Sequence, residues 1–216
     1  MLIRDCMTNT PITIPPSTSV PDALRLMRER KVRRLPVLDA RGKLVGIVSD
    51  KDLLLASPSP ATTLSVWELP EILGKLKVEA VMTRTVITVA EDTPLEEAAR
   101  LMADKRIGGL PVMRGETLAG IITETDLFKT LLQLMGGRRA GVRITAQASG
   151  AKGTLAKMTS AVFGLGGDIV GLGFKEIAGS SGQEWEIMLK VQDAPKDKLV
   201  EALRPVVHAI LDVREA

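Results

Sequence analysis

The sequence predicts an α+β protein in which a duplicated segment is followed by a domain of different pattern. Gly46–Asp52 reads Gly-Ile-Val-Ser-Asp-Lys-Asp, and Gly120–Asp126 reads Gly-Ile-Ile-Thr-Glu-Thr-Asp, 74 positions later. After Gly136-Gly137 the repeated pattern stops and strand-like alternation begins. Because an internal repeat decides the architecture of a chain, we expect two β-α-β-β-α repeats and then a β-α-β-β-α-β domain.

Each repeat has the same order of elements. Met7–Ile14 aligns with Met82–Val89 at an offset of 75, and a polar turn then leads into a helix with an apolar stripe. Leu35-Pro36-Val37 matches Leu110-Pro111-Val112 at the same offset, and an Arg-Gly hairpin turn follows in both copies. One residue fewer in the second turn changes the offset to 74 for the closing strand and helix. A register kept with one deletion indicates duplication.

The segments between and after the repeats complete the domain prediction. A Pro- and Ser-rich loop over 57–63 precedes a short linking helix expected over Val66–Leu76. We expect the first repeat over 1–64, the linking helix and second repeat over 65–136, and the C-terminal domain over 137–216. In that domain we expect strands at Val142–Ala148, Ile169–Phe174, Glu184–Val191 and Val206–Val213, and helices at Thr154–Leu165 and from Pro195 to Leu203.

Composition excludes several classes of protein. The net charge is only +3 and the Lys and Arg residues are dispersed, so the sequence has no basic patch of the kind that binds nucleic acid. Only 2% of the residues are aromatic, so side chains on which bases could stack are also scarce. The single cysteine, Cys6, excludes an internal disulfide and a Cys-based zinc site and suits a reducing compartment. No apolar run approaches the roughly 18 residues of a membrane span, and Met1–Asp5 does not open a secretory signal. We therefore expect a cytoplasmic protein without nucleic-acid or membrane partners.

The repeats resemble a known family. Leu-Pro-Val and the closing Gly-x-x-Ser/Thr-x-x-Asp of each copy resemble the CBS domain, pairs of which form one module around a pseudo-twofold axis. Residues 140–216 resemble the ACT domain, a ferredoxin-like, ligand-sensing and dimerising fold, in element order, Gly153-x-Leu155 and Gly164–Asp168. With the linker Ser65–Leu69, the combination is similar to the accessory protein family of bacterial acetoin utilisation. The resemblance implies a regulatory homodimer in acetoin or related carbon metabolism, with an enzyme as a candidate partner.

The closing motifs Ser49-x-x-Asp52 and Thr123-x-x-Asp126 have two interpretations. A hydroxyl followed three residues later by an acid is the capping box of a helix start. The same carboxylate can accept hydrogen bonds from both hydroxyls of a ribose, while the hydroxyl and the first-turn amides suit a phosphate. CBS pairs that bind adenosyl ligands use these positions in that way. The resemblance thus implies AMP, ADP, ATP or another adenosyl compound as a regulatory ligand, with no required cofactor.

The rest of each pocket is expected around the Leu-Pro-Val strand and the segment before it. The alternative is that Leu-Pro-Val simply begins a buried strand, where proline is tolerated at the first position. An adenine would lie between aliphatic groups and take hydrogen bonds from the main chain. The expected residues are Thr13, Ile14, Leu35, Pro36 and Val37 in the first copy, and Thr88, Val89, Leu110, Pro111 and Val112 in the second.

The two copies differ where phosphate charge would be bound. Arg34 in the first copy corresponds to Gly109 in the second, and Lys51 corresponds to Thr125. Arginine offers a planar fork to phosphate oxygens and lysine a mobile point charge. We therefore predict unequal sites, with phosphate contacts led by Arg34 and Lys51. The alternative is that the basic run over 30–34 is a solvated helix end.

A second ligand site is considered in the ACT-like part. ACT relatives hold amino acids in the loop between first strand and helix, which here supplies Ser149, Gly153, Thr154 and Leu155, with Asp168 before the second strand. The acid and Pro-Gly that relatives often carry in this loop are missing, which favours dimerisation over amino-acid binding. The glycines at 164–167 end a helix and are better explained as a C-cap than as a dinucleotide-binding loop.

The sequence does not supply the residues of an active site. His208 is alone in an apolar stretch and Cys6 has no His partner nearby in sequence, so neither a catalytic triad nor a metal cluster can be assembled. We predict a ligand-sensing protein that is not an enzyme and acts by population shift. The alternatives are a structural dimerisation adaptor with empty CBS pockets, and, third, an enzyme fragment with chemistry supplied by a ligand metal.

Overall fold

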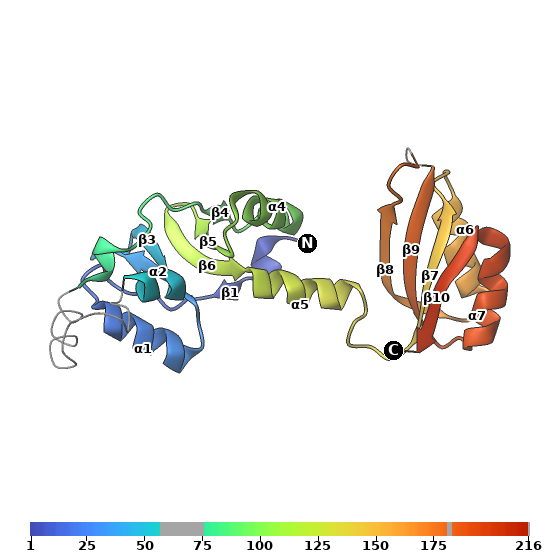
Figure 1. The fold of residues 1–216 in the computed structure, drawn as a ribbon, viewed down its shortest axis with the longest axis horizontal. Coiled ribbons are helices and arrows are strands. Elements are labelled where there is room, and N and C mark those ends of the chain that lie inside the picture. The colour runs from blue at the N-terminus through green and yellow to red at the C-terminus, as the bar shows by residue number, and fades with distance from the viewer. Residues whose placement is uncertain (57–75, 181–182, 216) are drawn as a thin grey trace. The chain divides into compact units, whose positions relative to one another are not determined.

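The structure is a computed structural model that describes residues 1–56, 76–180 and 183–215 (Figure 1). The chain divides into two compact units, Met1–Leu127 and Phe128–Ala216. Apart from Leu76, the expected linking helix over Val66–Leu76 and the loop over 57–63 lie outside the described residues. The domain boundaries near 64 and 136 stay predictions.

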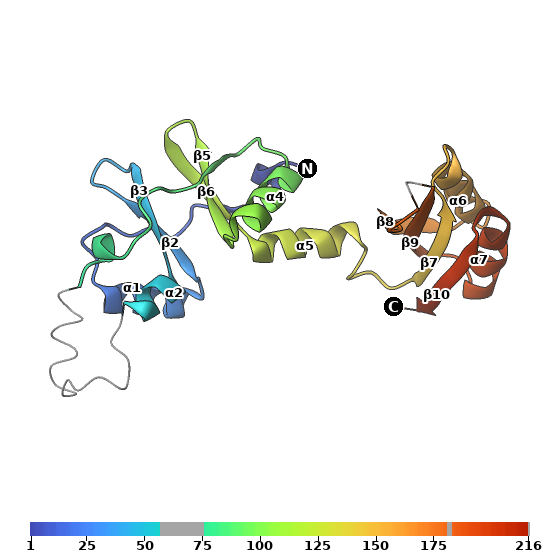
Figure 2. The ribbon, with the colours of Figure 1, turned by 45° about the horizontal axis from the view of Figure 1, so that its top comes forward.

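The first repeat, described over residues 1–56, is a β-hairpin covered by two helices. Helices α1 and α2 pack beside the antiparallel β2–β3 hairpin, and Met27 of α1 is buried with Leu35 and Val37 of β2 (Figure 2). Its elements are η1 (Ile3–Asp5), β1 (Thr8–Asn9), α1 (Val20–Arg30), β2 (Arg34–Leu38), β3 (Leu44–Ser49) and α2 (Asp50–Leu55).

The second repeat, which begins at residue 76 of the described chain, follows the same plan. Lys31 after α1 and Arg106 after α4 both adopt the left-handed conformation with φ of 54°, so the two helices end at equivalent positions. The β5–β6 hairpin has its register shift after Val112, where β2–β3 has it after Val37. The elements are η2 (Val78–Ala80), β4 (Val89–Ala90), α4 (Leu95–Lys105), β5 (Gly109–Arg114), β6 (Thr117–Thr123) and α5 (Glu124–Leu134).

The N-terminal segment of each repeat pairs with the other repeat. β1 of the first repeat is antiparallel to β6 of the second, with Thr8 opposite Ile121. Thr83, the equivalent of Thr8, exchanges two backbone hydrogen bonds of 2.9 and 3.0 Å with Ile47 of β3. The two halves of the first unit are therefore joined crosswise by their own leading segments.

The hydrophobic core of each repeat includes side chains from the leading segment of the other repeat. Ile3 and Met7 are buried among Leu110 and other side chains of the second repeat. Val78 and Met82 are buried in the core of the first repeat. Burial of one aliphatic side chain contributes about 1.5–3 kcal/mol, so the exchanged segments contribute to the stability of both halves.

The second unit is a four-stranded antiparallel sheet with α6 and α7 on one face (Figure 1). The strand order is β10-β7-β9-β8, and the element order is the predicted β-α-β-β-α-β. The last strand begins at Ala209, later than the expected Val206, because Pro205 lies in a 3-10 turn that suits its fixed φ. The elements are β7 (Val142–Ser149), α6 (Thr154–Phe163), β8 (Asp168–Glu176), β9 (Glu184–Gln192), α7 (Lys196–Leu203), η3 (Arg204–Val206) and β10 (Ala209–Glu215).

The segment that follows α5 packs closely on β8. A Cβ added at Gly171 would lie 2.4 Å from the carbonyl oxygen of Met135, and one at Gly173 would lie 2.9 Å from its Cε. These two glycines alternate with Leu172, which packs against the core under the helices, so Met135 lies on the opposite face of the sheet. Glycine is needed at 171 because the contacting atom belongs to backbone and cannot turn away.

Candidate functional site

Both closing motifs form capping contacts at a helix start. The hydroxyl and the amide of Ser49 donate to Asp52 Oδ2 at 2.7 and 2.9 Å, and the Asp52 amide donates to Ser49 Oγ at 3.2 Å. In the second repeat, Thr123 Oγ1 and its amide donate to Asp126 Oδ2 at 2.7 and 3.0 Å. The capping interpretation is therefore realised in the structure, and it fixes where each carboxylate lies.

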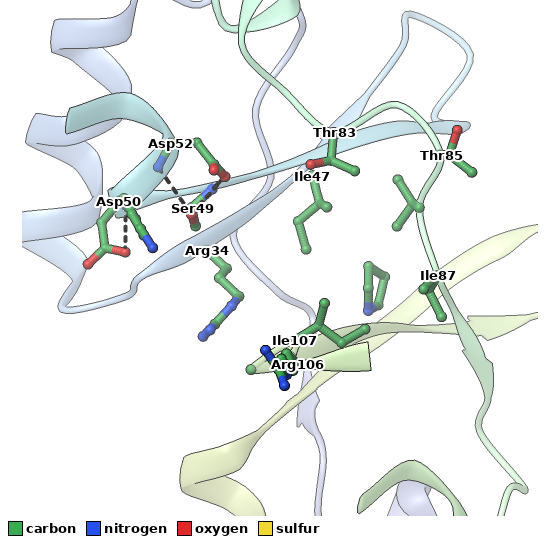
Figure 3. A pocket seen from close by; sticks show the side chains of 15 residues that line it. Arg34, Ile47, Ser49, Asp50, Asp52, Thr83, Thr85, Ile87, Arg106 and Ile107 are labelled. Carbon is green, nitrogen blue, oxygen red and sulfur yellow. Dashed lines mark hydrogen bonds between the residues drawn. The ribbon is translucent and has the colours of Figure 1, made fainter. Parts of the chain in front are cut away.

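The first motif faces a cavity of about 450 Å³ between the repeats, shown in Figure 3. This volume is within the range of small-molecule and cofactor pockets. The first repeat contributes Arg34, Ile47, Ser49, Asp50, Lys51 and Asp52, and the second contributes Thr83, Thr85, Val86, Ile87, Arg106, Ile107, Gly108, Gly109 and Pro111. We call this space the first cavity.

The second motif faces a related cavity of about 240 Å³, here called the second cavity. Thr8 and Thr10 in this cavity correspond to Thr83 and Thr85 in the first. In the second cavity the first repeat therefore contributes the leading segment and the second repeat contributes the closing motif. The first repeat now contributes Thr8, Thr10, Pro11, Ile12, Lys31, Val32, Arg33 and Arg34, and the second contributes Ile121, Thr123, Thr125 and Asp126. Each cavity thus combines the closing motif of one repeat with the leading segment of the other.

The charged side chains make the two cavities unequal. The first cavity has three cations and two carboxylates: Arg34, Lys51, Arg106, Asp50 and Asp52. The second has three cations and one carboxylate: Lys31, Arg33, Arg34 and Asp126. Cations beside a carboxylate suit a ligand that carries both hydroxyls and an anionic group, since the carboxylate accepts from hydroxyls and the cations bind the anion.

The predicted nucleotide-binding residues divide into two groups. Seven of them line the cavities: Arg34, Ser49, Lys51, Asp52, Pro111, Thr123 and Asp126. Nine lie outside these two cavities: Thr13, Ile14, Leu35, Pro36, Val37, Thr88, Val89, Leu110 and Val112. Leu35, Val37, Leu110 and Val112 are fully buried in the core, and Thr88 lines a separate pocket of about 260 Å³. A binding role for any of the sixteen residues stays a prediction.

Sequence reasoning missed the threonines of the leading segments. Thr8 and Thr10 line the second cavity, and Thr83 and Thr85 line the first. The recurring Met-Thr-x-Thr pattern was the available signal. Arg106 was also missed, and Lys31 and Arg33 of the basic run line the second cavity although both are exposed.

The residues predicted for an ACT effector site lie at the end of β7 and the start of α6. Ser149 Oγ accepts a hydrogen bond of 3.1 Å from the Ala151 amide, and Gly153 precedes α6 with φ of 88°. Thr154 and Leu155 form the first turn of α6, and Asp168 is exposed at the start of β8. They line none of the cavities described above.

Over residues 1–56, 76–180 and 183–215, no group of three or more His, Cys, Asp and Glu side chains could hold a metal ion. In the same part of the chain, no helix is both long and apolar enough for a membrane crossing.

The family follows from comparison with known proteins. The family model of the CBS domain matches residues 3–59 and 78–133, just over half of the chain. The chain belongs to the CBS domain family. The two matched segments coincide with the two repeats.

Three solved structures are similar to the CBS part. A putative acetoin utilization protein (AcuB) from Vibrio cholerae is 34% identical, with 62% of this chain and 92% of that chain covered and a TM-score of 0.53. The CBS domain pair of protein MJ0100, in complex with 5'-methylthioadenosine and S-adenosyl-L-methionine, is 29% identical, with 64% and 98% covered and a TM-score of 0.52. CBSX2, in complex with AMP, is 37% identical, with 61% and 96% covered and a TM-score of 0.51.

Proposed function

We propose that this CBS protein is a regulatory sensor that binds an adenine nucleotide, or another adenosyl compound, between its two repeats. The observation that carries the proposal is that each cavity combines the hydroxyl–carboxylate motif of one repeat with two threonines and at least one cation of the other. The adenosyl ligands of the MJ0100 pair and of CBSX2 support the same ligand class.

Sensing follows from the crosswise construction. Because a bound nucleotide touches both repeats, it favours the arrangement of repeats in which all its contacts are made, and the population shifts toward that arrangement. A partner that distinguishes the two arrangements then responds to the nucleotide. Asp126 lies in the first turn of α5, and that helix leads through Met135 to the C-terminal sheet. A change in the position of α5 on ligand binding would therefore be passed along the chain to the C-terminal unit.

We further propose that the C-terminal unit is an ACT-like domain that dimerises the protein and receives the signal. Its β-α-β-β-α-β order and four-stranded antiparallel sheet support this assignment. The likeness to the AcuB structure supports a role in acetoin or related carbon metabolism, with a cytoplasmic enzyme as the regulated partner. In this proposal the protein itself catalyses no reaction.

One observation favours a second function, that of a dimerisation adaptor with empty cavities. Both carboxylates already accept two hydrogen bonds within their capping boxes, so the motifs have a structural purpose without any ligand. The adaptor would bind its partner whether or not nucleotide is present.

Calorimetric titration separates the two functions. Nucleotide-stripped protein is titrated with AMP, ADP, ATP, S-adenosylmethionine and NAD. Saturable binding that weakens in Asp52→Ala and Asp126→Ala supports the sensor, and the ranking of ligands identifies the signal. Absence of binding by all five contradicts the sensor and favours the adaptor.

A further inference from the structure

We infer that Arg34 is shared by the two cavities, so that a phosphate-bearing nucleotide in one cavity weakens the binding of a second in the other. The inference deepens the proposed function and rests on it. Of the described residues that line the cavities, Arg34 is the one that lines both. Its counterpart in the second repeat is Gly109, which has no side chain to offer.

Arg34 reaches both cavities because it lies over two glycines of the second repeat. A Cβ added at Gly108 would lie 2.1 Å from Arg34 Nη2 and 3.0 Å from Cζ, and one at Gly109 would lie 3.1 Å from Cδ. The guanidinium therefore occupies the space that a side chain at 108 would fill, and the Arg34 Cδ lies close beside Gly109. Figure 3 shows Arg34 extending from the first repeat toward Arg106 and Ile107 of the second.

The two repeats carry different residues at these equivalent positions. The first repeat has Arg33-Arg34 where the second has Gly108-Gly109. Besides Arg34, the first cavity has Arg106 and the second has Arg33. At the paired positions 34 and 109, however, one guanidinium serves both cavities, because Gly109 contributes no side chain.

One guanidinium binds one phosphate in the bidentate geometry that makes arginine effective. Once a first nucleotide holds Arg34, the second must bind with the remaining cations alone, Lys51 and Arg106 in the first cavity or Lys31 and Arg33 in the second. Hydrogen bonds to charged groups contribute enough that the loss weakens the second binding by about 10-fold or more. An adenosyl ligand without phosphate does not use the fork, so its binding does not interfere. The sites thus favour occupancy by one phosphorylated and one unphosphorylated ligand.

The test is calorimetric titration of the full chain with AMP, and with adenosine as the phosphate-free control. We expect Arg34→Gln to weaken the tighter AMP step by about 10-fold while leaving the adenosine affinity unchanged. Lys51→Gln, in the first cavity alone, and Arg33→Gln, in the second alone, are matched controls. Each is expected to weaken one step without removing the interference between the sites.

The interference itself is measured by disabling one cavity at a time. If Arg34 is shared, either Asp52→Ala or Asp126→Ala should leave a cavity that binds AMP about 10-fold more tightly than the second step of the unmodified protein. The same variants should show no such gain with adenosine. Because these variants keep Arg34, the test does not depend on the folding of Arg34→Gln. Gly108→Ala, whose methyl would overlap Nη2, should also weaken AMP and spare adenosine.

The outcomes separate the inference from the proposed function. Independent AMP steps, or an Arg34→Gln variant that weakens adenosine as much as AMP, overturn the shared arginine while the sensor stands. Failure of both AMP and adenosine to bind overturns the proposed function and the inference with it.

Discussion

Replacing Asp52 by alanine removes the acceptor of two hydrogen bonds at the start of α2. The amide and hydroxyl of Ser49 donate to its Oδ2 at 2.9 and 2.7 Å, and Ser49 is half-buried. A cap contact contributes about 1 kcal/mol, and an amide left without an acceptor costs about as much again when water reaches it poorly. We expect Asp52→Ala to lower the free energy of unfolding by about 1–2 kcal/mol.

Asparagine at position 52 separates the cap from the charge. Its amide carbonyl can still accept from the Ser49 amide, so the free energy of unfolding should fall by no more than about 0.5 kcal/mol. Hydrogen bonds to a carboxylate are roughly twice as strong as neutral ones. We therefore expect both Asp52→Asn and Asp52→Ala to weaken AMP binding by about 10-fold or more.

The assay combines calorimetric unfolding without ligand and calorimetric titration with AMP. Asp39→Ala is the matched control, because Asp39 Oδ1 accepts two backbone hydrogen bonds of 2.9 and 2.8 Å in the β2–β3 turn and lines neither cavity. The control should lose stability and keep its AMP affinity. Unchanged AMP affinity in Asp52→Asn would refute a ligand role for the carboxylate and leave the cap as its whole purpose.

Three further predictions concern stability and protonation. Gly171→Ala places a Cβ 2.4 Å from a backbone oxygen, so calorimetry should find the free energy of unfolding lower by about 1–3 kcal/mol. Its control, Gly164→Ala, meets its nearest atom at 3.5 Å and should change stability by less than about 1 kcal/mol. Thr145→Val should raise the free energy of unfolding by about 1 kcal/mol in urea titrations, because the buried Thr145 Oγ1 has no hydrogen-bond partner among the described residues. A hydrogen bond and ion pair of 2.6 Å from Arg114 hold the pKa of Glu91 below its ordinary value, so the pair stabilises the fold above the unfolded pKa and is lost as pH falls through the folded pKa. Arg114→Gln should return the Glu91 pKa toward its ordinary value in an NMR titration.

Each of these can fail in a defined way. A Gly171→Ala variant as stable as Gly164→Ala would mean that the segment after α5 does not pack on β8 in solution. A destabilising Thr145→Val would mean that the hydroxyl has a partner. A Glu91 pKa that does not respond to Arg114→Gln would show that the ion pair does not persist.

The duplication and most elements could be predicted from sequence because they depend on local patterns. The repeated closing motif and the Leu-Pro-Val strand kept their spacing, and the hairpin turns kept their glycines. Pro205 marked the end of a helix, but the 3-10 turn that delays β10 to Ala209 leaves no periodic signal.

The crosswise pairing could not be predicted, so the residues expected around each pocket were all taken from one repeat. The two leading segments are 75 positions apart in sequence whether each packs on its own repeat or on the other one. The spacing therefore does not tell which repeat Thr8 contacts. The apolar run at Leu35–Val37 is buried throughout, so its pattern does not tell which face meets a cavity. The cavities are instead lined by the preceding residue, Arg34, and by the threonines of the opposite leading segment.

The exchanged leading segments also bear on how such a protein could arise. A single ancestral repeat would have carried the hydroxyl–carboxylate motif but no opposing wall, so it could have enclosed a ligand only by pairing with an identical copy. Both cavities of that pair would have been the same. Fusion of two copies into one chain would have freed the halves to diverge. The cavities now differ at two such equivalent pairs of positions, Arg34 with Gly109 and Lys51 with Thr125.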